Sequence, residues 1–372
     1  MPLAGLRVWG DFVAEGTASY QQHDWDGAIT NYTKAIEQNP ASFVAYYDRG
    51  MAKKAKQDLD GAIADYNKAI ELRADHPNYY LNRGNAKAAK GDAAGAIADY
   101  NQTIKLKPDF WQAYLNRANA KCQADGLVDS WETPLVSGEA VAKMESALAD
   151  YSKAIEINPG LTEAYFSRGY LRYLQGRLDQ ADAKSTQTKD NWDGALADFS
   201  KIIELQPTNA NAFCLRGIIK TAQGETESGL ADYSQAIELD PANVRALFNR
   251  ALARIARHDL DRALTDFNQA KALQPGNGQT AQINLGLSQI YCVHARDKWL
   301  KDDADGALAD LNQSIELNPA NAESYRNRGI IEQRKHAYQS AEADYTKALE
   351  LAPGDSALQE SLDKVKKYLK EK

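Results

Sequence analysis

The chain has 372 residues, of which 44% are apolar and 26% charged, and its formal net charge is −7. The negative charge argues against nucleic acid as the main partner, because phosphate binding needs clustered Lys and Arg. No apolar run reaches the roughly 18 residues of a membrane span. The three cysteines and five histidines are scattered, which predicts neither a disulfide framework nor a metal site.

The first residues, "MPLAGLRVWGDFVAEG", lack the basic region and the apolar core of a signal peptide. We expect a cytoplasmic protein if the chain is complete, and a periplasmic or exported one if a leader has been removed. The sequence also contains no Gly-rich phosphate loop and no nucleophile elbow. We therefore expect no catalytic residues, no cofactor and no bound metal.

One sequence motif recurs along the chain. It appears as "DGAITNYTKAIEQNP" from Asp26, as "DGAIADYNKAIEL" from Asp60 and as "GAIADYNQTIKLKP" from Gly95. Its copies lie 34 residues apart where nothing is inserted, and a fixed period of this length predicts a repeat architecture. Nine units are expected, at approximately residues 9–42, 43–76, 77–110, 111–161, 162–209, 210–243, 244–277, 278–321 and 322–353.

Each unit is predicted to form two helices, because apolar residues recur three and four positions apart. The first helix carries segments such as "AYYDRGMAKK" from Ala45, and the second carries the recurring motif. Small residues recur where the two helices must approach closely, since a bulky side chain would overpack the contact. On the first helices these are Gly50, Gly84, Ala118, Gly169, Gly217, Ala251 and Gly329.

The unit resembles the tetratricopeptide repeat (TPR) in its length, its Gly/Ala–Tyr–Ala–Pro skeleton and its helix–turn–helix form. The resemblance covers about Trp9 to Pro353, and the recurring sequence motif is similar to that of bacterial and photosynthetic-organism members of the family. It implies an all-α fold, a right-handed α-solenoid of about nine helix pairs in which residues 1–353 form one continuous solenoid with a shared core.

Residues 354–372 are expected to form a capping helix over the last repeat. Leu358, Leu362, Val365 and Leu369 make a single apolar stripe at helical spacing. A dimer surface is the alternative interpretation of this stripe.

Repeats four, five and eight exceed 34 residues by 17, 14 and about 10 residues. We interpret all three insertions as lying between the two helices of a repeat, so that they project from one edge. Insertions on one face often mark a binding face, although surface loops also tolerate neutral changes in length. Trp131 in the first insertion is a candidate anchor for a partner, since Trp is enriched at interfaces.

Arginines recur at one position of the first helices, and aspartates recur at one position of the second helices. A structural ladder of ion pairs is favoured over an anion-binding row, because every charge has a candidate partner. Whether the pairs form within or between repeats stays open. At the arginine position, repeats one and eight are expected to have Glu15 and Asn284.

The resemblance implies that the first helix of each unit lines a concave groove with residues spaced i, i+3, i+7. The polar residues at these positions are Asn78, Asn85, Gln112, Asn119 and Gln123. The apolar ones, in repeats five to eight, are Phe166, Tyr170, Tyr173, Cys214, Ile218, Phe248, Leu252, Ile255, Ile283, Leu287 and Tyr291. Helices that face water should not be apolar nearly all round, so the groove is either filled from within or receives an apolar ligand.

Some TPR co-chaperones bind a C-terminal carboxylate through lysines and asparagines on successive first helices. Here Asn85 and Asn119 are present, but Val13 and Leu81 stand where such lysines would be. We therefore do not expect this clamp.

The sequence favours a non-enzymatic interaction scaffold that binds a protein or peptide segment with apolar anchors in its groove. The alternative is a self-associating assembly or sorting factor, a homo-oligomer that serves a larger complex such as one in a membrane.

Overall fold

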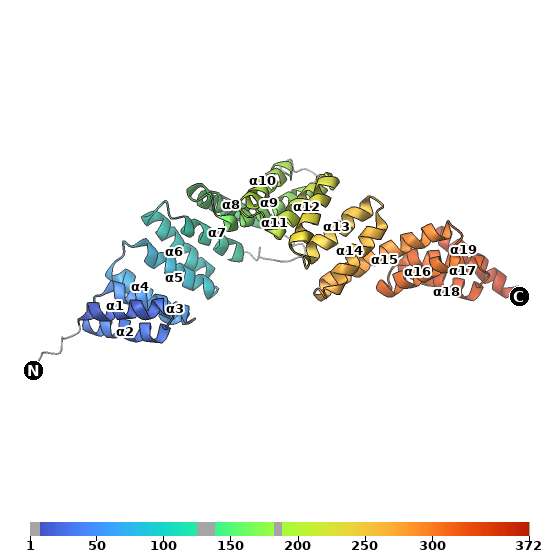
Figure 1. Cartoon of the computed structure of the whole chain (residues 1–372). Coiled ribbons are helices and arrows are strands. Elements are labelled where there is room, and N and C mark those ends of the chain that lie inside the picture. The colour runs from blue at the N-terminus through green and yellow to red at the C-terminus, as the bar shows by residue number, and fades with distance from the viewer. Residues whose placement is uncertain (1–7, 125–137, 182–187, 372) are drawn as a thin grey trace, which may run out of the picture. The chain divides into compact units, whose positions relative to one another are not determined.

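The computed structural model describes residues 8–124, 138–181 and 188–371. These residues form nineteen α-helices and no strands, and within each of the two units described below consecutive helices pack against one another. The predicted all-α fold of helix pairs is confirmed, whereas the right-handed superhelix, the count of nine repeats and the single continuous solenoid stay predictions. The chain divides into two compact units, Met1–Gln206 (unit 1) and Pro207–Lys372 (unit 2), which are described separately below (Figure 1).

Unit 1 contains five helix pairs in the part of the chain that the structure describes. Their bounds are α1 (Trp9–Gln21), α2 (Trp25–Gln38), α3 (Phe43–Ala55), α4 (Leu59–Leu72), α5 (Pro77–Ala89), α6 (Ala93–Leu106), α7 (Trp111–Ala124), α8 (Gly138–Ile157), α9 (Thr162–Ala181) and α10 (Thr188–Leu205). Trp131, the candidate anchor in the first insertion, lies outside the described residues.

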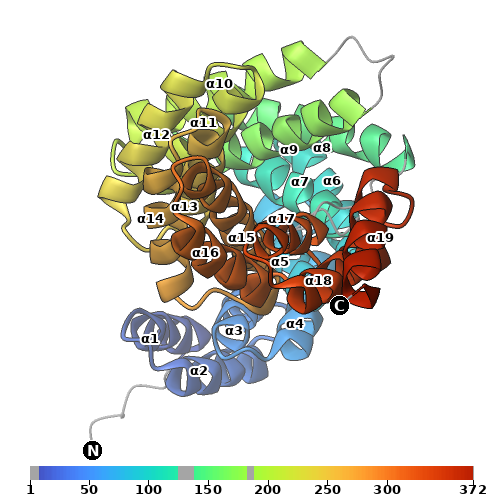
Figure 2. The same cartoon turned by 90° about the vertical axis from the view of Figure 1, so that its right-hand side faces the viewer.

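Unit 2 contains four helix pairs and a last single helix among its described residues. Their bounds are α11 (Ala210–Ala222), α12 (Thr226–Leu239), α13 (Val244–Ala256), α14 (Leu260–Ala272), α15 (Asn277–Trp299), α16 (Ala304–Leu317), α17 (Ala322–Arg334), α18 (Tyr338–Leu351) and α19 (Ser356–Lys370). Helix α19 packs alongside α18 (Figure 2), with Leu358, Leu362 and Val365 buried against Ala341, Tyr345 and Ala348.

The turn between the helices of a pair depends on an aspartate and a glycine. The Asp58 carboxylate accepts the N–H of Gly61 at 2.9 Å and so caps α4. A side chain at Gly61 would clash with this carboxylate. The residue before the aspartate, Gln57, is left-handed with a φ of 66°, which ends the preceding helix. The aspartates that cap α2, α6 and α16 in the same way are Asp24, Asp92 and Asp303.

The core of most pairs is a tyrosine or phenylalanine of the second helix packed against a small residue of the first, and in the α15–α16 pair Leu311 takes this position. In the second repeat a Cβ atom at Gly50 would lie 2.8 Å from Cε1 of Tyr66, and Tyr66 is fully buried. Ala62 and Ala69 beside it are also fully buried. The predicted reason for small residues on the first helices, a close approach of the two helices, is therefore observed.

The arginine ladder pairs within repeats and also contacts the preceding repeat. Arg49 donates to both carboxylate oxygens of Asp65, at 2.9 and 2.7 Å, and to the Thr33 hydroxyl of the preceding repeat at 3.1 Å. Lys53, one helical turn later, lies 2.8 Å from the same aspartate. The other within-repeat pairs are Arg83–Asp99, Arg117–Asp150, Arg168–Asp198, Arg216–Asp232, Arg250–Asp266 and Arg328–Asp344.

The ladder shows where the extra residues of each long repeat lie. Paired Arg and Asp residues are 16 positions apart in the regular repeats, 33 apart between α7 and α8, and 30 apart between α9 and α10. The extra residues of these two repeats therefore lie between the paired Arg and Asp, and part of them lengthen α8, α9 and α10 to 20, 20 and 18 residues.

In repeat eight the extra residues lie elsewhere, which corrects the sequence interpretation. Asp310 pairs at 2.7 Å with Lys298, twelve positions earlier, as Asp65 does with Lys53. The connection from α15 to α16 is thus of ordinary length, and the insertion lengthens the N-terminal part of α15. The ladder arginine is replaced by His294, sixteen positions before Asp310, and not by Asn284.

The last repeat keeps the Arg328–Asp344 pair but lacks the second cation of the ladder. Glu332 stands where repeats two to eight have a Lys or Arg, and burial together with the Asp344 charge raises the pKa of its carboxyl to about 7. Between pH 4.5, the ordinary value, and pH 7, the folded chain holds more protons than the unfolded chain. The free energy of unfolding therefore falls as the pH rises through this window.

We expect Glu332→Lys to supply the missing second cation beside Asp344 and to raise the free energy of unfolding at pH 8. The gain should be about 1 kcal/mol, because water screens this half-buried position. Melting curves at pH 5 and pH 8 would measure it, with Glu316→Lys as an exposed control that makes the same charge change. Equal gains for the two variants, or an equal gain at both pH values, would contradict the ladder explanation.

Candidate functional site

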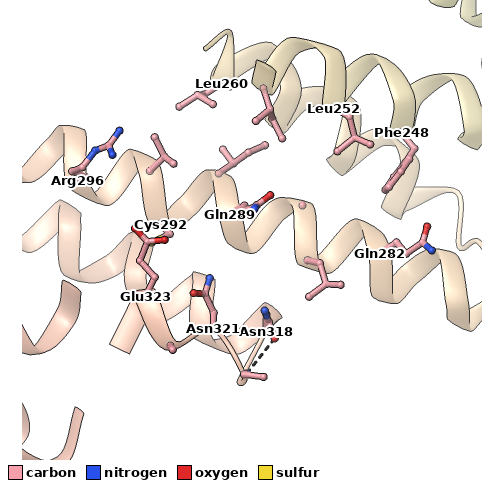
Figure 3. A pocket seen from close by; sticks show the side chains of 17 residues that line it. Phe248, Leu252, Leu260, Gln282, Gln289, Cys292, Arg296, Asn318, Asn321 and Glu323 are labelled. Carbon is pink, nitrogen blue, oxygen red and sulfur yellow. Dashed lines mark hydrogen bonds between the residues drawn. The ribbon is translucent and has the colours of Figure 1, made fainter. Parts of the chain in front are cut away.

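Unit 2 contains a pocket of about 830 Å³ that we call the α13–α15 pocket. It lies along α15, between α13 on one side and the α16–α17 connection on the other (Figure 3). Its lining includes Phe248, Leu252, Ile255, Leu260, Gln282, Leu285, Gln289, Cys292, Val293, Arg296, Asn318, Asn321 and Glu323.

One side of the pocket is apolar and open to solvent. Leu252 on α13 is 41% exposed and Leu285 on α15 is 50% exposed, which are large values for leucines of a helical core. Phe248 is held in place by an edge-to-face contact with Phe267, whose ring centroid is 5.6 Å away. These side chains form a fixed apolar surface that a ligand could cover.

The opposite side is polar and partly positioned by hydrogen bonds. The Asn321 side chain caps α17 by accepting the N–H of Ser324 at 3.2 Å, and it donates to the Ser288 hydroxyl at 3.0 Å. The side chains of Gln289 and Glu323 have no hydrogen-bond partner among the described residues, so the polar groups of these side chains are available to a ligand. Arg296 lies at one end of the pocket, where Asp297 approaches it only to 3.9 Å.

Cys292 is the one thiol that lines the pocket in the part of the chain described. Burial raises the pKa of this thiol, and Asn327 lies within hydrogen-bond distance of its sulfur at 3.4 Å. A thiol with a raised pKa stays protonated at neutral pH and is a poor nucleophile. The pocket is thus equipped for binding through apolar contacts and amide hydrogen bonds.

Three of the groove residues that we expected from the sequence line this pocket, whereas others lie in the core. Phe248, Leu252 and Ile255 all line the pocket. Ile283 and Leu287 are buried in the core between α13, α14 and α15, and Tyr291 packs against the same cluster. The physical reason is the lengthened start of α15. Ten residues are not a whole number of helical turns, so positions counted from the start of the repeat fall on a different face of this helix.

The residues of α15 that do line the pocket were missed from sequence. They include Gln289, Val293 and Arg296. The signal that could have found them is the twelve-residue spacing of Lys298 and Asp310, which matches that of Lys53 and Asp65 and sets the register of the helix.

The remaining apolar candidates lie away from this pocket. Phe166, Tyr170 and Tyr173 are half-buried on α9 of unit 1, where the Phe166 ring contacts Phe199 edge to face at 6.0 Å. Ile218 on α11 of unit 2 packs against a cluster around Cys214, which is itself buried.

The polar candidates lie in unit 1, and two of them, Asn85 and Asn119, hydrogen-bond to residues of neighbouring helices. Asn85 accepts hydrogen bonds from the Tyr100 hydroxyl at 2.9 Å and from Asn116 at 2.8 Å. Asn119 accepts from the Tyr151 hydroxyl at 2.6 Å and donates to Glu163 at 3.3 Å. Gln123 is exposed at the end of α7. These asparagines therefore link successive helix pairs.

Comparisons with known proteins agree with this architecture. A family model described as "TPR repeat" matches residues 16–57, 50–91 and 219–256, and one described as "Tetratricopeptide repeat" matches residues 81–120 and 292–356. Together these ranges cover more than half of the chain, and the last one begins inside α15, after its additional residues. The chain belongs to the tetratricopeptide-repeat family, whose members are generally non-enzymatic protein-interaction scaffolds.

Several solved structures are similar to the chain. YrrB, a TPR protein with an unusual peptide-binding site, is 22% identical, with 58% of this chain and 95% of YrrB covered and a TM-score of 0.45. A tetratricopeptide repeat protein from Parabacteroides merdae is 16% identical, with 75% and 98% covered and a TM-score of 0.47. The TPR domain of P58(IPK) is 17% identical, with 98% of both chains covered and a TM-score of 0.30. No curated protein sequence matches the chain.

The described part of the chain contains neither a membrane-spanning helix nor a metal-binding cluster. None of its helices combines the length and the apolar composition that crossing a bilayer requires. No group of three or more His, Cys, Asp or Glu side chains there is arranged to hold a metal ion.

Proposed function

We propose that the chain is an interaction scaffold that binds an extended segment of a partner protein in the α13–α15 pocket. The observation that carries this proposal is the pair of exposed leucines, Leu252 and Leu285, in a pocket of about 830 Å³. Ligand pockets commonly measure roughly 300–1,000 Å³ and combine apolar walls with a few polar groups.

The two sides of the pocket fit the two parts of an extended segment. Covering the leucines with apolar side chains would contribute roughly 25 cal/mol for each Å² removed from water. An extended backbone also carries N–H and C=O groups without internal partners, which the side chains of Gln289 and Glu323 can bond. A helical segment would gain less from these polar groups, because its own backbone already pairs internally.

Peptides selected from a random display library against the purified protein would test this proposal. We expect the selected peptides to contain aliphatic or aromatic residues, and we expect the double change Leu252→Ser with Leu285→Ser to weaken their binding at least tenfold. The melting temperature should change little, because both side chains are exposed. Leu273→Ser is the matched control, since Leu273 is 40% exposed and lies outside the pocket.

Two results would contradict the proposal. Equal binding by the double variant and the wild type would place the binding surface elsewhere. A concentration-dependent dimer that the double change dissolves would show that a second copy of the chain occupies the pocket, in agreement with the self-association alternative.

A further inference from the structure

Several repeats are linked to the preceding repeat by an ion pair near the turn. Lys56, seven residues after the ladder arginine Arg49, ends α3 and pairs with Asp26 in the first turn of α2, thirty residues earlier. The pairs that form in the same way at the same spacing are Lys90–Asp60, Arg257–Glu227 and Lys335–Asp305.

Repeat five lacks the cation of this pair. Gln175 on α9 stands seven residues after the ladder arginine Arg168, where the repeats above have a Lys or Arg. The acidic residue is present, because Glu145 on α8 lies thirty residues before Gln175. Glu145 is exposed and forms no ion pair among the described residues. An ion pair found elsewhere in the chain is therefore without its positive half here.

A pocket of about 270 Å³, which we call the α8–α10 pocket, lies at this position in unit 1 and is lined by both Glu145 and Gln175. Gln175 is only 7% exposed, yet its side-chain amide has no hydrogen-bond partner among the described residues. A buried amide without a partner costs free energy, which a ligand that bonds to it recovers. The amide is available to such a ligand, because Gln175 lines the pocket.

The acidic groups outweigh the basic ones in the α8–α10 pocket. Besides Glu145 it contains Asp179, which accepts a hydrogen bond from the Asn191 amide at 2.8 Å but forms no ion pair in the described part of the chain. Arg172 also lines the pocket, but its guanidinium is bonded to the Asp198 carboxylate at 2.8 Å. Although the ladder arginine shares that carboxylate, the one positive charge left over is smaller than the charge of the two acidic groups.

The arrangement of these groups suits a guanidinium better than an ammonium. The acceptor oxygens of the pocket come from three helices, α8, α9 and α10, and a ligand must donate in several directions to reach them. A guanidinium has five N–H donors in a plane, whereas an ammonium has three. Leu148 and Leu178 line the same pocket and can cover the methylene stem of an arginine.

We propose that the α8–α10 pocket binds an arginine side chain of a partner protein. The guanidinium supplies the positive charge that a Lys or Arg supplies in other repeats, and it donates to Glu145, to Asp179 and to the amide oxygen of Gln175. The volume of about 270 Å³ is below the roughly 300–1,000 Å³ usual for small-molecule sites, which favours a single protein side chain. The net charge of −7 also favours a basic partner. This site does not depend on the α13–α15 pocket, which lies in unit 2.

NMR of the full chain with matched probes would test this proposal. The indole N–H of Trp192 is the reporter, because Trp192 is buried and packs closely against Gly176, the neighbour of Gln175. We expect N-acetyl-arginine methylamide to shift this signal in a saturable way and to lose the effect in high salt. The neutral isostere N-acetyl-citrulline methylamide should leave the signal unchanged, and N-acetyl-lysine methylamide should bind more weakly.

Two variants connect this binding to the absent cation. Gln175→Lys places a cation in the pocket, and Glu145→Gln removes an acidic group, so each should lower the affinity for the arginine probe at least tenfold. Because Glu145 is exposed, Glu145→Gln should leave the melting temperature unchanged, and it tests the site even if Gln175→Lys destabilises α9. Glu227→Gln is the matched control and should leave binding unchanged, since Glu227 occupies the same repeat position but already pairs with Arg257.

Four results would overturn the proposal. They are an unshifted Trp192 signal with the arginine probe, equal binding of the citrulline probe, full affinity in Glu145→Gln, and an equal loss of affinity in Glu227→Gln. Binding of the lysine probe as tight as that of the arginine probe would overturn the choice of arginine.

Discussion

Removal of residues 354–372 should destabilise unit 2 by several kcal/mol and make the protein aggregate. The deletion takes away three buried side chains, Leu358, Leu362 and Val365. Burial of one such side chain is worth about 1.5–3 kcal/mol. It also exposes Tyr345 and Ala348 on α18, because the outer face of a terminal repeat has no neighbour to cover it.

Thermal melting and light scattering of the full and truncated chains would measure this effect. Deletion of residues 371 and 372 alone is the control, since it keeps the apolar stripe of α19. Full retention of the melting temperature and solubility after the longer deletion would show that α19 is not a cap, and would favour the dimer-surface interpretation of its stripe.

Asp266→Ala should cost about 3–5 kcal/mol in the free energy of unfolding, the usual range for breaking a buried ion pair. The Asp266 side chain is only 2% exposed and receives Arg250 at 2.7 Å and Arg254 at 2.5 Å. The change leaves two guanidinium groups without their acceptor in the space between α13 and α14. Chemical denaturation would measure the loss.

Glu227→Ala provides the matched control for this variant. Glu227 also pairs with an arginine, Arg257 at 2.7 Å, but its side chain is 75% exposed. Surface pairs of this kind contribute about 0–1 kcal/mol. Comparable losses for the two variants would show that burial does not set the strength of the ladder.

The helix pairs and their order could be predicted from the sequence. The information is local, because the period of apolar residues, the Asp58–Gly61 turn and the small residue at Gly50 each act within one repeat. The apolar stripe of the last helix could likewise be identified from the sequence, and its residues Leu358, Leu362 and Val365 are buried together. Phe248, Leu252 and Ile255, the groove positions expected on α13, line the α13–α15 pocket, and their role in binding stays a prediction.

Only the tertiary structure decided which residues of α15 meet the pocket. An insertion changes the length of a repeat without stating which helix absorbs it, so Ile283 and Leu287 were assigned to the groove but lie in the core.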